Sequence, residues 1–458
     1  MIVMKFGGSS VADAARLRHI GGIVQAYSDK KPAVVLSAMG DTTDHLLEAA
    51  DAALQNGKTE IERVEKLHLA AVKNLKLRGE LHCKMPIHEE IKKLLDELSR
   101  LLSGIALIRE LTPRTKDYLV SFGERLSVRI AAAYFRSIGI NARGFDAWEL
   151  GFVSNSDFGH AELIEKSWKM IPEKIMPLIK TGVLPVITGF IAQDERGNIT
   201  TLGRGGSDLS ATMIAAACKA DEVQVWKDVD GILTADPRIV KNARPVQNVS
   251  YEEASELAYF GAQVLHPRAM LPCMKTGTPV LVKNSYTLEA PGTRIGSESF
   301  TTTKNCAYVC AITARPGVTL VDIVSTRMLG QFGFLAEIFS AFARKSISVD
   351  MVATSEVSVS LTLDTAYDLG ELKKELSKIA SVEIKKGKAI ISIIGDVRRS
   401  SEILARTFKI CQLIGVPVQM ISQGASKVNI SFIVDDIEAE EVIKSLHIEF
   451  FGKLERLS

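Results

Sequence analysis

Short β-branched runs alternate with helical stretches through the first two-thirds of the chain, and this alternation constrains the fold more than any other feature. It predicts an α/β domain with a largely parallel sheet. The expected strands, each bounded by Gly, Pro or polar turn residues, cover 2–6, 33–37, 141–145, 183–188, 222–226 and 279–283. Between 59 and 111 the sequence is rich in Leu, Lys and Glu, which predicts a helical insertion into this domain.

An internal repeat follows a Pro/Gly- and Ser/Thr-rich stretch that begins near residue 289. Five apolar positions recur with a constant shift of 69 (404 − 335): Leu335, Ala336, Phe339, Ile347 and Val349 return as Leu404, Ala405, Phe408, Val416 and Val418. Each copy predicts a strand, an amphipathic helix and two further strands. In the first copy the helix is expected to bury one face, formed by Leu335, Ile338, Phe339 and Phe342. Each copy is too small for a deep core of its own, so the two should pack together.

Composition excludes several classes of protein. The 56 Lys and Arg residues nearly balance the 54 Asp and Glu residues among 458, which argues against a nucleic-acid surface built on bulk charge. No stretch of 18 apolar residues is free of charge and no signal peptide is visible, so we expect a cytoplasmic protein without a membrane segment. Six cysteines without a C-x-x-C pair predict reduced thiols and no protein metal site.

Two glycine-rich turns each leave a predicted strand or loop and enter a predicted helix. The first is Lys5-Phe6-Gly7-Gly8-Ser9-Ser10, and the second is Gly203-Arg204-Gly205-Gly206-Ser207-Asp208. Free N–H groups at a helix start favour an anion, a lysine adds a point charge, and an arginine can hold a carboxylate with two hydrogen bonds. The alternative is an ordinary strand–helix turn, in which Asp208 only caps its helix.

Other polar strings follow predicted strands or open helices, where open α/β sheets bind ligands. They include Ser37–Gly40 with Thr42 and Thr43, Ser121–Glu124 at an expected helix start, and Trp226–Gly231. A carboxylate at Glu124 near Arg204 would form an amino-acid pocket, since one side chain pairs with an ammonium and the other with a carboxylate. Glu124 could equally serve only the dipole of its own helix.

In order and context, these strings and Phe260–Pro267 resemble those of the aspartokinases, specifically the lysine-sensitive, monofunctional type with two ACT regulatory domains. The resemblance covers essentially the whole chain. It implies a three-layer α/β amino-acid-kinase domain of the carbamate-kinase type over 1–296, and two βαββαβ ACT domains over 314–386 and 387–458. The second ACT domain would be completed by a strand from 304–313.

The resemblance further implies transfer of the γ-phosphate of MgATP to the β-carboxylate of L-aspartate, giving 4-phospho-L-aspartate, the first step towards lysine, threonine and methionine. Lys5, Arg204 and Asp208 would be catalytic. Residues implied to bind ATP are Lys5, Gly7, Gly8, Ser9, Lys227, Asp228, Leu233, Arg238 and Gln263. Those implied to bind aspartate are Ser37, Thr43, Glu124, Arg204 and Ser207. Gln263 stands where many members of the family carry Lys. Leu233 stands where some members carry Tyr.

For regulation, the resemblance implies feedback inhibition by L-lysine at the first ACT domain. The implied lysine site comprises Met328, Gln331, Phe334, Leu335, Val349, Asp350, Ser355 and Glu356. Asp350 or Glu356 would take ammonium groups. Lysine alone, lysine with S-adenosylmethionine, and threonine stay open as effectors, and a homodimer through the ACT domains, or a tetramer, is expected. The rival functions are a related amino-acid kinase with another acceptor and a non-catalytic amino-acid sensor on a kinase scaffold.

Overall fold

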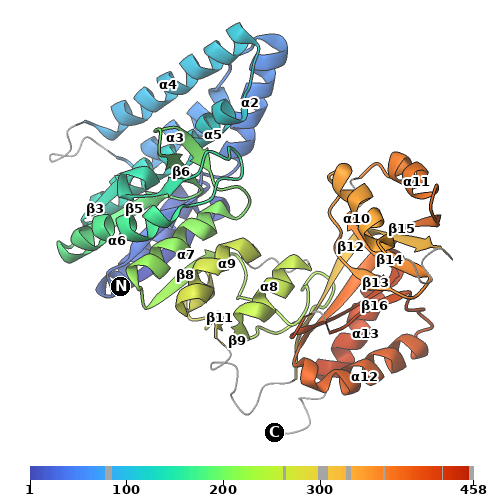
Figure 1. Cartoon of the computed structure of the whole chain (residues 1–458). Helices are drawn as coiled ribbons and strands as arrows, with labels where there is room; N and C mark the ends of the chain where they lie inside the picture. The colour runs from blue at the N-terminus through green and yellow to red at the C-terminus, as the bar shows by residue number, and fades with distance from the viewer. Residues whose placement is uncertain are drawn as a thin grey trace. The chain divides into compact units, whose positions relative to one another are not determined.

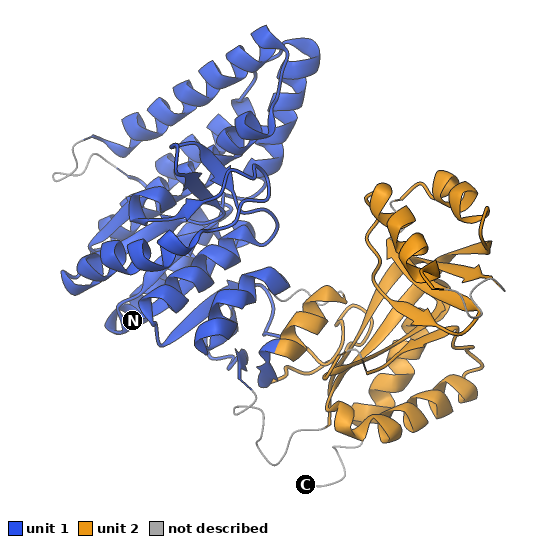
Figure 2. Ribbon diagram, in the orientation of Figure 1, with its two compact units in different colours: residues 1–232, 247–251, 265–301 blue, residues 233–246, 252–264, 302–458 orange. Residues whose placement is uncertain are grey.

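The computed structural model describes residues 1–77, 85–260, 265–297, 308–325, 332–364, 367–424 and 426–452. Two compact units divide the chain (Figure 2). The first comprises Met1–Ile232, Gln247–Tyr251 and Leu265–Thr301, and the second comprises Leu233–Val246, Glu252–Val264 and Thr302–Ser458. Among the described residues, no helix combines the length and apolar character that a bilayer crossing requires.

The first unit is built on an eight-stranded sheet in the order β3-β5-β2-β1-β8-β10-β11-β9 (Figure 1). Neighbouring strands run parallel except the antiparallel pair β10–β11. The strands are β1 (Ile2–Phe6), β2 (Ala33–Leu36), β3 (Ala142–Phe145), β5 (Leu184–Thr188), β8 (Glu222–Lys227), β9 (Asn248–Ser250), β10 (Val280–Asn284) and β11 (Thr293–Gly296). A small sheet contains β4 (Val153–Ser154), β6 (Ile191–Asp194) and β7 (Ile199–Thr201). All six predicted strands are thereby confirmed, within one or two residues at their ends.

Two groups of helices pack on the eight-stranded sheet. One contains α1 (Ala14–Ala26), α2 (Thr42–Asn56), α3 (Glu62–Asn74), α4 (Ile87–Ile108) and α5 (Pro113–Ser137). The other contains α6 (Glu165–Lys180), α7 (Gly206–Cys218) and α9 (Pro267–Thr276). Side chains alternate across a strand, so Ile2, Met4 and Phe6 of β1 join the core beneath the first group, while Lys5 reaches α7 on the opposite face. This alternation directs a lysine out of an otherwise apolar strand towards the glycine-rich turns.

Helix α5 begins earlier than the sequence suggested. Ser121–Glu124 was expected to open a helix, but the helix starts at Pro113, so these residues lie two turns inside it. The start signal is Thr112, whose side chain accepts a hydrogen bond from the backbone N–H of Thr115 at 3.1 Å, followed by proline at the first helical position. Buried Glu124 is therefore no first-turn dipole partner.

The second unit contains a six-stranded antiparallel sheet in the order β13-β14-β12-β15-β17-β16. Its strands are β12 (Val309–Val324), β13 (Val352–Thr354), β14 (Ser358–Asp364), β15 (Ser381–Gly395), β16 (Met420–Ser422) and β17 (Asn429–Asp435). Its helices are α10 (Phe334–Arg344), α11 (Gly370–Leu376), α12 (Ser400–Leu413) and α13 (Ala439–Phe451). The long strands β12 and β15 pair along their length and serve both repeat copies. Residues 309–315 pair with the strand of the second copy, so one continuous sheet joins the two modules.

The predicted buried face of the first repeat helix is partly wrong. Ile338 and Phe342 are buried as expected, but Leu335 and Phe339 are 40% and 38% exposed. Phe334 and Ala341 complete the buried stripe instead. The helix is apolar around more of its circumference than one sheet can cover. Leu335 and Phe339 therefore form a second, partly exposed apolar stripe, and both stripes recur in the second repeat copy.

Two segments that precede the repeat in sequence pack with the second unit. Ala235 and Val240 belong to the core of the second repeat copy, and Phe260 contacts the core between the copies. Helix α8 (Tyr251–Tyr259) adds a hydrogen bond from the Asn429 amide to the Glu256 carboxylate, at 2.9 Å. The predicted catalytic range 1–296 thus includes segments that share a core with the repeat.

Candidate active site

Lys5 and Asp208 bring the two glycine-rich turns together. Lys5 lies near the end of β1, and Asp208 lies in the first turn of α7, just after the second glycine-rich turn. Their Nζ and Oδ1 atoms are 2.6 Å apart, and each side chain is 11% exposed. This buried ion pair fixes the Lys5 side chain where the two turns meet.

The first turn differs from the expected helix entry. Gly8–Val11 forms a 3-10 turn, and α1 begins only at Ala14, because Asp13 caps it by accepting a hydrogen bond from the Arg16 backbone N–H at 2.9 Å. A Cβ on Gly8 would lie 3.0 Å from the carbonyl oxygen of Ala38 and 3.2 Å from that of Gly40, so a larger residue would have to displace the backbone there. The turn packs against the loop after β2 and leaves Ser9 exposed.

Lys227 at the end of β8 adds a second ammonium. Burial lowers its pKa, the Asp208 carboxylate opposes that shift, and the positive charge of Lys5 reinforces it. Lys5, Asp208 and Lys227 therefore form one electrostatic cluster at the carboxyl ends of adjacent parallel strands, which pair between Phe6 and Trp226. The Asp228 carboxylate also opposes the shift, so two ammonium and two carboxylate groups interact here. The two ammonium groups can donate hydrogen bonds to an anionic ligand.

Ser37 and Ser207 join the loop after β2 to the start of α7. The Ser37 hydroxyl donates a hydrogen bond to the Ser207 hydroxyl at 3.1 Å. A Cβ on Gly189 would lie 2.7 Å from the Cβ of Ser207, so the loop after β5 also approaches this point closely. Thr43 lies half-buried in the first turn of α2, one residue beyond the buried Thr42.

Glu124 is a buried carboxyl group that has no ion pair with any of the described residues. Its residue is 3% exposed, and its Oε1 accepts a hydrogen bond from the Ala38 backbone N–H at 3.2 Å. Its Oε2 is buried and has no hydrogen-bond partner among the described residues. Burial raises the pKa of Glu124 to about 8, and the hydrogen bond from Ala38 lowers it by a smaller amount. A half-satisfied buried carboxyl group is expected where a ligand supplies the missing partner.

Arg204 and His266 lie at the second turn. Arg204 is exposed and has no hydrogen bond or ion pair within the described parts of the chain. Burial lowers the pKa of His266, and the positive charges of Arg204 and Arg268 lower it further, whereas Asp208 opposes the shift. His266 thus lies close to both Arg204 and Asp208. Gly205 has φ +74°, and a Cβ there would lie 2.5 Å from the Cβ of His266. His266 belongs to the string Phe260–Pro267, and the sequence alone predicted no role for it.

Asp117 on α5 was not singled out from the sequence at all. It is 2% exposed, and its carboxylate accepts hydrogen bonds from the Thr201 backbone N–H and hydroxyl, both at 2.8 Å, and from the Gly159 N–H at 2.9 Å. Asp117 therefore fixes the chain three residues before Arg204. Only the fold joins residues 117 and 201, so no local pattern could have indicated this role.

Four further residues predicted to bind the nucleotide stay predictions. Asp228 is exposed just after β8. Leu233 and Arg238 belong to the second unit, and the Arg238 guanidinium is held by its neighbour Asp236, with the shortest separation at 2.6 Å. Gln263 lies outside the described residues.

The predicted lysine-site residues that the structure describes lie around α10 and the hairpin β13–β14. Phe334 is buried, Leu335 is exposed, and Val349 packs on the core of the first copy. Ser355 and Glu356 are exposed in the turn between the strands. Met328 and Gln331 lie outside the described residues.

Asp350 already has partners. Its carboxylate is 3.1 Å from the Arg315 guanidinium, and it accepts a hydrogen bond from the Tyr259 hydroxyl at 2.7 Å. Burial and the bond to Asp350 raise the pKa of Tyr259 to about 12. Asp350 therefore joins α8 to the first repeat copy, and an incoming ammonium would have to compete with Arg315.

Both family profiles and individual known proteins match the chain. The amino acid kinase family profile matches residues 1–284, and an ACT domain profile matches 321–367 and 391–450. Aspartokinase 1, chloroplastic, of Arabidopsis thaliana is 48% identical over 98% of this chain and 80% of its own length. Lysine-sensitive aspartokinase 3 of Escherichia coli is 36% identical, covering 98% of this chain and 99% of its own length.

Solved structures agree with these matches. The crystal structure of E. coli aspartokinase III in complex with aspartate and ADP has a TM-score of 0.82 at 35% identity, covering 98% of this chain and all of that one. The Clostridium acetobutylicum aspartate kinase has the same TM-score at 28% identity and the same coverage. The expected kinase fold with ACT domains is confirmed, and so is the expected activity. The chain belongs to the amino acid kinase family and, within it, to the aspartokinases.

Proposed function

We propose that the cluster around Lys5 and Asp208 transfers the γ-phosphoryl group of MgATP to the β-carboxylate of L-aspartate in this aspartokinase. A carboxylate oxygen bonds to the γ-phosphorus as the bond to the ADP oxygen breaks, so no proton has to leave the acceptor. Catalysis then depends on positioning and charge stabilisation. The observation that carries the proposal is the buried Lys5–Asp208 pair, which fixes an ammonium at 2.6 Å from a carboxylate between two glycine-rich turns.

The remaining polar groups bind the phosphates of ATP or the aspartate. Gly7, Gly8 and Ser9 line the phosphates, and Lys227 offsets their negative charge. Arg204 holds the α-carboxylate of aspartate because its guanidinium is exposed and free of other partners among the described residues. Glu124 pairs with the ammonium through the oxygen that lacks a hydrogen bond. Ser37, Thr43 and Ser207 lie between these groups and bind the rest of the acceptor.

The acceptor is tested by measuring ADP release with L-aspartate, L-glutamate and N-acetyl-L-glutamate in a coupled assay. We expect turnover with L-aspartate alone, because an acylated amine cannot pair with Glu124 and a longer side chain misplaces the reacting carboxylate. Preference for another acceptor would indicate a different amino-acid kinase activity. Absence of ATP turnover with all three would favour a non-catalytic sensor.

L-lysine is the proposed feedback effector, bound at the first ACT domain near Phe334, Leu335 and Glu356. Exposed Glu356 is available for an ammonium, whereas Asp350 is paired with Arg315 and Tyr259. Because Tyr259 ends α8, release of that bond would free a helix in the part of the chain that matches the kinase family. Titration of the kinase assay with lysine, threonine, and lysine plus S-adenosylmethionine distinguishes the three effector options.

A homodimer through the ACT domains is part of the proposal, with a tetramer as the larger option. Leu335 and Phe339 in the first copy, and Leu404 and Phe408 in the second, repeat a stripe that the chain leaves partly open. Sedimentation equilibrium with Leu335→Asp and Phe339→Asp measures whether this stripe holds subunits together. The cytoplasmic location stays a prediction, because the plant relatives are named chloroplastic.

A further inference from the structure

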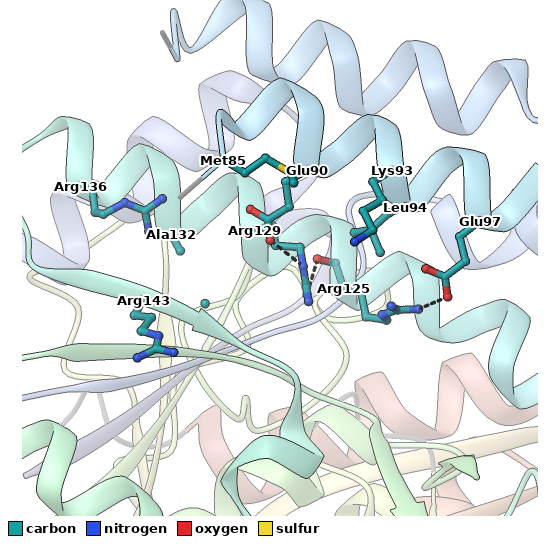
Figure 3. A pocket seen from close by; sticks show the side chains of 11 residues that line it. Met85, Glu90, Lys93, Leu94, Glu97, Arg125, Arg129, Ala132, Arg136 and Arg143 are labelled. Carbon is teal, nitrogen blue, oxygen red and sulfur yellow. Dashed lines mark hydrogen bonds and ion pairs between the residues drawn. The ribbon is translucent and has the colours of Figure 1, made fainter. Parts of the chain in front are cut away.

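A cavity of about 470 Å³ lies where α4, α5 and β3 meet, and its lining is unusually cationic (Figure 3). Two acidic side chains, Glu90 and Glu97, face it. Five cationic ones do as well: Lys93, Arg125, Arg129, Arg136 and Arg143. The small remainder of the lining is Met85, Leu94, Ala132 and Gly144. The volume is that of an ordinary small-molecule site, and the lining favours an anion.

Arg125 has ion pairs with Glu97 and Asp146, but two of its buried nitrogens make no hydrogen bond among the described residues. Its side chain is 11% exposed, and its Nε and Nη1 are buried without a hydrogen-bond partner in the part of the chain that the structure describes. The nearest carboxylates are too far for one: Glu97 Oε1 lies 3.6 Å from Nη1, and Asp146 Oδ2 lies 3.7 Å from Nε. Glu97 instead accepts a hydrogen bond from the Tyr118 hydroxyl. Buried guanidinium N–H groups without acceptors are costly, and a ligand oxygen would satisfy them.

Arg129 differs, because its own partners are complete. It makes two hydrogen bonds to Asp146, at 2.7 and 2.9 Å, and its Nε lies 3.1 Å from Glu90. These contacts fix the orientation of Arg129 in the cavity lining. Most acidic side chains nearby are thus already paired, whereas exposed Lys93 and Arg143 lie at the rim of the cavity. In Figure 3 the labelled side chains of α4 and α5 project into the space between the two helices.

We propose that this cavity is a second ligand site, which binds a small phosphorylated metabolite through its phosphate oxygens. Arg125 would donate to the phosphate from inside, and Lys93 and Arg143 would close over it from the rim. The site is separate from the kinase cluster. Glu124 and Arg125 are consecutive on α5, so their side chains leave the helix about 100° apart. Glu124 reaches the loop after β2, and Arg125 reaches the cavity.

The test uses the full chain and inorganic pyrophosphate as the probe. Saturating L-aspartate and MgADP, with magnesium in excess, occupy the kinase site during isothermal titration calorimetry. We expect one pyrophosphate per chain to bind, and Lys93→Ala and Arg143→Gln each to weaken binding about tenfold or more, from the loss of one charge-assisted contact. Both residues are exposed, so these variants should fold even where Arg125→Gln does not. Lys92→Ala is the matched control, because Lys92 is exposed on the same helix but does not line the cavity.

Hydrogen exchange locates the bound probe. Protection of 87–97 and 142–145 supports the site, and protection confined to 5–9 and 203–208 would assign the probe to the kinase cluster and overturn the inference. Failure of pyrophosphate to bind, or equal affinity in the cavity variants and the wild type, would also overturn it. Binding of citrate but not pyrophosphate would refute the phosphate class. We expect unchanged kinase turnover in Lys93→Ala, Arg143→Gln and Lys92→Ala, so the outcome is independent of the proposed catalytic roles.

Discussion

Replacing Glu124 with glutamine tests whether this buried carboxyl group serves the ligand or the fold. The change keeps the shape of the side chain and the acceptor for the Ala38 N–H, which now lies 3.2 Å from Oε1. It removes only the ability to ionise. We expect Glu124→Gln to weaken the binding of L-aspartate while making the folded protein more stable.

The binding effect depends on pH. With a pKa of about 8, roughly one Glu124 in ten is ionised at pH 7, but an ammonium pairs with the ionised form. The KM for aspartate in the wild type should therefore fall by about eightfold between pH 7.0 and 8.5, as the carboxylate becomes available. Glu124→Gln should raise KM at both values and lose that part of the pH dependence.

The stability effect has the opposite sign. The pKa of Glu124 rises from 4.5 to about 8 in the folded protein, so between these values the folded state keeps a proton that the unfolded state releases. The free energy of unfolding of the wild type therefore decreases as pH rises from 4.5 to 8, by at most about 5 kcal/mol, and then levels off. The Glu124→Gln variant has no ionisable group at this position, so its free energy of unfolding does not undergo this decrease. The advantage of Glu124→Gln should be near zero at pH 4 and largest at pH 8 and above.

Two measurements on Glu124→Gln test the expected effects on stability and on aspartate binding. Urea unfolding without ligands at pH 5 and pH 8 gives the stability difference, and initial rates at pH 7.0 and 8.5 give KM for aspartate. A variant that is less stable at pH 8 and binds aspartate as well as the wild type would refute the reasoning. Glu124 would then be a structural group.

Three further changes probe the turns. Lys5→Ala should lower kcat by about 10²–10³-fold, because it removes one preorganised charge beside Asp208; steady-state rates at saturating substrates measure this. Arg204→Ala should raise KM for aspartate by about tenfold or more with little change for ATP, as seen in saturation curves for each substrate. Gly205→Ala should lower kcat/KM and cost about 1–3 kcal/mol of stability in urea unfolding, because φ is +74° and the new Cβ would meet His266 at 2.5 Å.

Each change has a control. Lys5→Arg should recover part of the turnover, and near-normal turnover of Lys5→Ala would remove Lys5 from the mechanism. Arg196→Ala removes an exposed guanidinium elsewhere in the same unit and should leave KM unchanged. Gly277→Ala has nearly the same φ, +71°, but nothing within 4 Å of the new Cβ. If Gly205→Ala behaves like Gly277→Ala, close packing against His266 is not important.

The parallel sheet was predictable because each strand carries a local signal. The runs at 2–6 and 222–226 contain β-branched and aromatic residues and are bounded by turn residues, and they pair in the structure. Where a local signal was misread, the prediction was wrong, as at α5, whose start is encoded by Thr112 and Pro113 rather than by Ser121–Glu124. The repeat was predictable because its shift of 69 residues holds apolar positions in phase.

By itself, the sequence determined which residue types were available: a lysine ending a strand, glycines in two turns, an arginine and a carboxylate before a helix. Spacing along the chain cannot say which of these meet. Tertiary structure alone paired Lys5 with Asp208 and joined Asp117 to Thr201. It also buried Glu124 with one oxygen that has no partner among the described residues, and placed Arg125 in the lining of a cavity. The physical reason is that burial and charge contacts depend on separations of a few ångströms between residues many positions apart, and only packing sets those separations.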